Sequence, residues 1–240
     1  MLKLILLTLL VVVVGPAMAA KRAFVIGNGT YLDASILPNP MHDAEDVAAK
    51  LTRLGFRVTL GLDLTRDAFL RSFQKFSREL QREDLALFYY AGHGVQIGGE
   101  NYLFPTDAVV RNAEDVQSVL ISLNALLASL LRQAKTQIVI LDACRNNPFT
   151  PRIERASNTR AGGIARGLAR VYAGVGSFIA YSTQPGNVAA DGKGRNSPFT
   201  AALLRHMEND RIDVHALMRR VRTDVQQVSA GKQIPWESSS

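Results

Sequence analysis

The feature that most constrains the fold is the alternation of short apolar runs with amphipathic helical patterns along the chain. Five runs are rich in aliphatic, β-branched and aromatic residues and predict strands over residues 22–26, 56–62, 85–90, 137–141 and 177–183. Apolar residues spaced three and four apart predict helices over residues 41–54, 69–80, 123–131, 198–208 and 214–228. Apolar strands that alternate with such helices favour a mostly parallel sheet with helices on both faces. We therefore predict an α/β fold.

The first twenty residues have the layout of a secretory signal peptide. Lys3 gives a short positive start, residues 4–14 form a continuous apolar run, and Ala17-Met18-Ala19 is a cleavage site of the A-x-A type. The apolar run is too short to cross a bilayer as a helix. We expect residues 1–20 to be removed and the protein to be exported, to the periplasm or out of the cell. No membrane span is expected after that removal.

The chain is basic, with a formal net charge of +7, and the arginines concentrate between Arg152 and Arg170. The interleaved basic and aromatic patterns of nucleic-acid modules are absent, so we expect no nucleic-acid partner. We interpret residues 151–176 as an Arg-rich linker loop. A third reading of the whole chain, a basic protein that binds nucleic acid or anionic surfaces, rests only on charge and predicts binding that vanishes at moderate salt and shows no sequence preference.

Cys144 is the only cysteine, so the chain cannot form an internal disulfide. It is either a small core residue or a nucleophile. His93 follows the strand predicted over 85–90, and Cys144 follows the strand predicted over 137–141. Parallel sheets place their sites beyond the carboxyl ends of their strands. The two side chains would therefore meet if these strands are neighbours.

A thiol beside an imidazole can perform acyl transfer, most simply peptide hydrolysis. The imidazole takes the thiol proton or stabilises the thiolate, and it later protonates the leaving amine. The backbone N–H groups of Gly94 and Cys144 would face the oxyanion that develops. Taken alone, His93 can also be a structural histidine in a glycine-rich turn.

Three separated segments resemble the caspase-like cysteine peptidases, and most closely their bacterial relatives near metacaspases and orthocaspases. They are FYYAGHG at 88–94, LDACRNNPF at 141–149 and AYSTQPG at 180–186. In the caspase signature the histidine lies about 50 residues before the cysteine, and here the separation is 51 residues. The resemblance covers residues 21–240 and implies His93 as the base and Cys144 as the nucleophile of an endopeptidase.

The resemblance also implies an architecture. The fold would be the caspase-like three-layer α/β sandwich, with a mostly parallel six-stranded sheet. Residues 21–150 would correspond to the large subunit of caspases and residues 177–240 to the small one.

The substrate pocket implied by the resemblance is acidic. Caspases that cut after aspartate carry Gln two residues before the nucleophile, where metacaspases and this chain carry Asp, here Asp142. His42-Asp43-Ala44 matches a second acidic motif of metacaspases. We infer a pocket lined by Asp43 and Asp142, with Ser182 as a further substrate-binding residue, that accepts Arg or Lys. Asp43 is equally compatible with a helix N-terminal acid stabilised by the helix dipole.

We expect no cofactor and no metal. Many metacaspases bind calcium through acids that follow the histidine, but between residues 95 and 103 only Glu100 is acidic, which argues against a calcium requirement. The expected partners are peptides or proteins with basic residues, including the chain's own Arg-rich loop as a self-cleavage site. The alternative function is a catalytically silent caspase-like interaction module.

Overall fold

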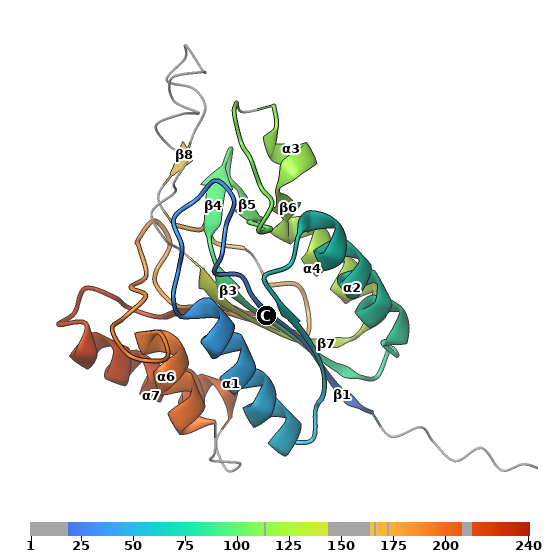
Figure 1. Ribbon diagram of the computed structural model, residues 1–240. Coiled ribbons are helices and arrows are strands. Elements are labelled where there is room, and N and C mark those ends of the chain that lie inside the picture. Colours follow the sequence, from blue (N-terminus) through green and yellow to red (C-terminus); the bar gives the residue numbers. More distant parts are fainter. Residues whose placement is uncertain (1–18, 113, 144–163, 166, 172, 208–212) are drawn as a thin grey trace, which may run out of the picture.

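The computed structural model describes residues 19–112, 114–143, 164–165, 167–171, 173–207 and 213–240 (Figure 1). Within these residues the centre is a six-stranded sheet in the order β10-β9-β7-β3-β1-β2. Every neighbouring pair is parallel except β10 and β9. The strands are β1 (Lys21–Gly27), β2 (Arg57–Leu62), β3 (Leu85–Gly92), β7 (Thr136–Ala143), β9 (Ser177–Tyr181) and β10 (Trp236–Ser239).

Helices cover both faces of this sheet because successive residues of its strands point to opposite sides. On one face lie α1 (Pro40–Arg53), α6 (Pro198–His206) and α7 (Val214–Val228), packed on residues such as Val25 and Tyr89. On the other lie α2 (Arg66–Glu79) and α4 (Leu123–Gln133), packed on residues such as Phe24 and Phe88. The predicted α/β sandwich with a mostly parallel six-stranded sheet is confirmed.

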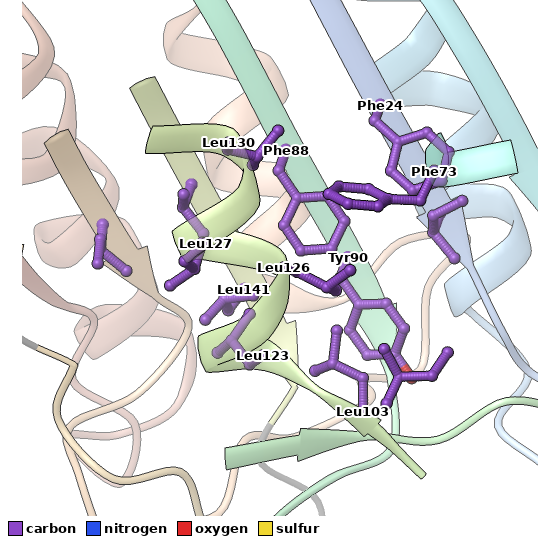
Figure 2. Packing of buried hydrophobic residues seen from close by; sticks show 14 of the residues in the cluster. Phe24, Phe73, Phe88, Tyr90, Leu103, Leu123, Leu126, Leu127, Leu130 and Leu141 are labelled. Atoms are coloured by element: carbon purple, nitrogen blue, oxygen red, sulfur yellow. The ribbon is translucent and has the colours of Figure 1, made fainter. Parts of the chain in front are cut away.

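The core on the α2 and α4 side is built from aromatic rings and leucines (Figure 2). Phe24 of β1 stacks on Phe88 of β3, with ring centroids 5.9 Å apart, and meets Phe69 of α2 edge to face at 5.7 Å. Leucines of α4 continue the layer toward β7. Such fully buried aromatic pairs contribute packing energy beyond the area they bury, and they fix the positions of the central strands.

A second, smaller sheet follows β3 and was not predicted. Its order is β6-β5-β4-β8, all antiparallel, with β4 (Gly94–Ile97), β5 (Glu100–Leu103), β6 (Ile121–Ser122) and β8 (Ile164–Ala165). A short helix, α3 (Val116–Val119), precedes β6. These strands are too short to show an apolar periodicity. The predicted loop over 151–176 is therefore interrupted, because β8 pairs with β4 inside that range.

None of the helices formed by the described residues is long and apolar enough to cross a membrane. The signal peptide falls on residues of which all but Ala19 and Ala20 lie outside the described part, so its removal and the export of the protein stay predictions. The division into large-subunit-like and small-subunit-like parts also stays a prediction.

Candidate active site

The two strands that lead to His93 and Cys144 are neighbours, which is the condition for the two side chains to meet. β3 and β7 run parallel and in register, and their last partners are Ala91 with Asp142 and Gly92 with Ala143. His93 directly follows one strand and Cys144 directly follows the other. Cys144 itself lies outside the described residues. The two strands therefore end at the same edge of the sheet and at the same level.

The imidazole of His93 is held in one orientation by the loop between β1 and α1. Its Nε2 lies 2.8 Å from the carbonyl oxygen of Ser35 and 3.3 Å from the Ser35 hydroxyl. Because a carbonyl oxygen only accepts hydrogen bonds, Nε2 carries the proton and donates it there. In the neutral imidazole, Nδ1 is then the nitrogen that takes up a proton. The ring is 1% exposed and lies 4.7 Å from the Tyr31 ring, centroid to centroid.

The backbone of His93 is also fully engaged. Its N–H donates to the Tyr31 hydroxyl at 2.9 Å, which in turn donates to the Asn28 carbonyl at 2.7 Å. Its carbonyl accepts from the Phe104 N–H at 3.1 Å and from the Tyr90 hydroxyl at 2.8 Å. Buried backbone groups with all their partners leave the residue no alternative conformation of similar energy. His93 is therefore preorganised by contacts from β3, from Phe104 directly after β5, and from the β1–α1 loop.

Gly92 and Gly94, on the two sides of His93, are each glycine for a different structural reason. Gly92 has a φ of +151°, and a Cβ there would lie 2.6 Å from the Tyr31 hydroxyl and 2.7 Å from the Tyr90 hydroxyl. A Cβ on Gly94 would lie 3.2 Å from the Ala143 Cβ. Gly94 is thus packed against the residue that precedes Cys144. The predicted oxyanion pair of Gly94 and Cys144 needs this proximity, and it stays a prediction because Cys144 is not described.

The two predicted acids come together although 99 residues separate them in the sequence. Asp43 in the first turn of α1 and Asp142 on β7 are both fully buried. Oδ1 of Asp43 accepts a hydrogen bond from the Ser197 backbone N–H at 3.0 Å. Oδ2 of Asp142 accepts from the Ser197 hydroxyl and, at 2.9 Å, from the Thr200 hydroxyl. Asp43 is therefore a first-turn acid whose carboxylate bonds to a different helix, α6.

Ser182 directly follows β9 and lies beside the end of β7. Its N–H donates to the Leu141 carbonyl at 2.9 Å, and its carbonyl accepts from the Gln233 side chain at 2.8 Å. The residue is fully buried, and its hydroxyl has no hydrogen-bond partner within the described part of the chain. Its substrate-binding role stays a prediction.

Three residues of this region were missed in the sequence: Ser35, Ser197 and Asp191. The Asp191 carbonyl accepts from the Asn39 side chain at the start of α1, and both of its carboxylate oxygens are buried. It adds a third acid to the end of the sheet where Asp43 lies. No local pattern marks these residues, because the partners named here lie between 55 and 154 positions away in the sequence.

No group of three or more His, Cys, Asp or Glu side chains suited to a metal ion is found among the described residues. Thiol–imidazole chemistry itself needs only the two side chains and oxyanion donors.

Comparison with known proteins agrees with this geometry. Residues 20–240 match the family model of the caspase domain, peptidase family C14. Over 130 residues, or 54% of its length, the chain is 30% identical to the human mucosa-associated lymphoid tissue lymphoma translocation protein 1 and to its mouse homologue. The matched segment spans 16% of the human relative and 15% of the mouse one. The match to the family model covers nearly the whole described chain, and the chain therefore belongs to the caspase domain family.

Proposed function

We propose that the protein is a cysteine endopeptidase in which His93 and Cys144 form the catalytic dyad. The observation that carries the proposal is the bond from His93 Nε2 to the Ser35 carbonyl. It leaves Nδ1 as the proton acceptor, at the end of the strand that neighbours the one leading to Cys144.

In the proposed reaction, His93 Nδ1 takes the thiol proton and the Cys144 sulfur attacks the carbonyl carbon of the scissile peptide bond. The oxyanion receives hydrogen bonds from the backbone N–H groups of Gly94 and Cys144. The tetrahedral intermediate collapses as Nδ1–H protonates the leaving amine, which yields a thioester. Nδ1 then deprotonates water, which attacks the thioester. The carboxylic acid leaves and the thiol regains its proton.

We propose cleavage after Arg or Lys because several aspartates lie together at this end of the sheet, and their negative charge attracts a positively charged side chain. Asp43 and Asp142 are fully buried and are bridged by Ser197, and Asp191 lies close by on the loop before α6. Carboxylates out of contact with water attract a guanidinium or ammonium group more strongly than exposed ones do. An aspartate side chain would be repelled there.

The first test compares residues 21–240 with a Cys144→Ala control on fluorogenic peptides. The peptides differ only at the residue before the cut: Arg, Lys, Asp, Ala or Leu, each with and without calcium. We expect cleavage after Arg or Lys that the control lacks. Cleavage after Asp would keep the dyad and overturn the acidic pocket. If the protein cleaved none of the peptides, the result would favour the alternative, a catalytically silent interaction module.

Two further proposals concern processing. We propose that active enzyme cuts itself in the Arg-rich loop, so that incubation yields two fragments from the wild type and none from Cys144→Ala. An intact single band after long incubation would contradict this.

We also propose that the protein is exported, and mass spectrometry of the mature chain from a secreting host should show Lys21 as the first residue.

A further inference from the structure

We propose that Ser197 is the positioning residue for substrate selectivity, because it fixes the carboxylates of Asp43 and Asp142 in one arrangement. The inference rests on the proposed function for the identity of the substrate. It adds a residue that neither motif matching nor the local sequence singles out. Ser197 touches no substrate in this account, and it acts through the two acids.

Ser197 uses a different group on each acid. Its backbone N–H donates to Asp43 and its hydroxyl donates to Asp142. The residue is fully buried and is the N-cap of α6, and its Oγ accepts from the Thr200 N–H at 2.9 Å. A serine hydroxyl has one proton. With a lone pair occupied by Thr200 N–H, the proton is directed at Asp142, so the cap and the bridge fix each other.

The bridge offsets the repulsion between two carboxylates brought together in a buried place. Hydrogen bonds from donors to charged acceptors are stronger than those between neutral groups. α6 is nine residues long, and its N-terminus adds the positive end of a helix dipole to the same point. Without these donors, the two side chains would move apart or turn toward other partners.

Hydroxyls behind Ser197 complete the support for Asp142. Thr200 donates its single proton to Asp142, so the Tyr89 hydroxyl, 2.6 Å from Thr200 Oγ1, is the donor in that pair. The chain of bonds runs from Tyr89 on β3 through Thr200 to Asp142 on β7. The position of the Asp142 carboxylate is thus tied to the neighbouring strand β3 and to α6.

The segment before Ser197 holds it against α1 from the other side. Arg195 binds both carboxylate oxygens of Asp46, at 2.9 and 3.0 Å, and the Asn196 side chain donates to the same group at 3.0 Å. Asp46 lies one turn after Asp43 on α1. Ser197 is therefore clamped between α1 and the sheet.

The expected signature is a change in KM without a matching change in kcat. For an Arg peptide, Ser197→Ala should raise KM about tenfold and leave kcat within about threefold, whereas the weak cleavage of a Leu peptide should keep its kcat/KM. Ser197→Thr keeps the hydroxyl and should restore the low KM. Ser197→Gly removes the hydroxyl but remains an acceptable N-cap, so it tests the same point if the alanine variant folds poorly.

Ser122→Ala is the matched control. Ser122 caps α4 by accepting from the Ala125 N–H at 3.2 Å, as Ser197 caps α6, but among the described residues no bond joins it to a carboxylate. Its loss should lower stability by about 1 kcal/mol and leave KM unchanged. An equal fall of kcat/KM for the Arg and Leu peptides in Ser197→Ala would assign Ser197 a purely structural role and overturn the proposal.

Binding separates this inference from the failure of the proposed function. Isothermal titration of Nα-acetyl-arginine amide into the inactive Cys144→Ala protein should show binding that Ser197→Gly, added to it, weakens about tenfold. That result would support the role of Ser197 even if no peptide were cleaved. Equal affinity of the two proteins, or no binding to Cys144→Ala, would overturn it. Cleavage after Arg with KM unchanged in Ser197→Gly would keep the enzyme and reject Ser197.

Discussion

Asn101 and Ala169 are joined by two hydrogen bonds in which the side-chain amide of one pairs with the backbone of the other. Asn101 Nδ2 donates to the Ala169 carbonyl at 2.8 Å, and its Oδ1 accepts from the Ala169 N–H at 2.7 Å. The preceding residue, Leu168, is 1% exposed and packs beside Gly94. Asn101 thus holds residues 168–169, which belong to the predicted Arg-rich loop, next to the proposed oxyanion donor Gly94.

Asn101→Ala should therefore destabilise the protein by about 2 kcal/mol, because it leaves both backbone groups of Ala169 without these partners. For a domain of this size, we expect a fall in Tm of about 4 to 8 °C. Differential scanning calorimetry measures it. Asn124→Ala, the same change at an exposed position of α4, should leave Tm within about 2 °C. Equal Tm values for both variants would show that the pair contributes little.

Gly92→Ala should prevent folding or lower Tm sharply. The position has a φ of +151°, and the new Cβ would meet two tyrosine hydroxyls at 2.6 and 2.7 Å. Gly98→Ala is a matched control, because Gly98 also has a positive φ, +61°, but no atom lies within 4 Å of its Cβ position. The control isolates backbone strain, which costs about 1 kcal/mol. Soluble Gly92→Ala protein with the Tm of the control would refute the steric argument.

Tyr31→Phe should lower kcat about tenfold at constant KM. The change removes the hydroxyl that accepts from the His93 N–H, and a misplaced base slows proton transfer without altering the acids that we propose bind substrate. Tyr102→Phe removes a hydroxyl that donates to Glu100 at 3.1 Å, and it should change kcat less than twofold. Steady-state kinetics on the Arg peptide distinguish the two. An unchanged kcat in Tyr31→Phe would mean that the bond to the Ser35 carbonyl is enough to hold the His93 imidazole in place.

Asp84 should make the fold sensitive to acid. Burial alone would raise its pKa, but bonds from the Gln81 and Ala20 N–H groups and the Arg22 guanidinium outweigh burial and lower the pKa from its usual 3.8 in the full chain. The donors on Gln81 and Arg22 remain after removal of residues 1–20. A group with a lowered folded pKa stabilises the fold above its unfolded value and loses that effect as the pH falls through the folded value.

Thermal unfolding at several pH values tests this expectation. Asp84→Asn should have a lower Tm than wild type between pH 5 and pH 7, and the difference should shrink as the pH falls below about 3.8. Asp67→Asn, at an exposed position 3.7 Å from Arg71, should match wild type throughout. A difference for Asp84→Asn that stayed constant down to pH 2 would contradict a charge effect.

The architecture was predictable because most of its main strands contain dense apolar runs. Residues 85–90 were predicted as a strand and form most of β3, and Ser122 and Asp213 cap the helices that were predicted over residues 123–131 and 214–228. A rule about parallel sheets pointed to the edge at which β3 and β7, the strands that lead to His93 and Cys144, both end. The second sheet was missed since its strands have two to four residues, and the four-residue β10 lies outside the predicted strands.

The supporting contacts of the site were not predictable, for a physical reason. Ser35 acts through a backbone carbonyl, which every residue has, so its identity carries no signal. Ser197 directly precedes the helix predicted over residues 198–208, but its bonds to Asp43 and Asp142 depend on how α1, α6 and β7 pack. The Asn101 side chain donates to the backbone carbonyl of Ala169, which lies 68 residues away in the sequence. Such contacts arise from tertiary packing and leave no periodicity in the sequence.

The shared register of β3 and β7 has a consequence for how this chain can change in length. Side chains alternate between the two faces of a sheet, so one residue inserted or deleted within either strand would turn every later side chain to the opposite face. His93 would then leave the edge that the Cys144 segment reaches. Insertions and deletions that preserve function are thus confined to the connections between strands, and the lengths of β3 and β7 are fixed relative to each other.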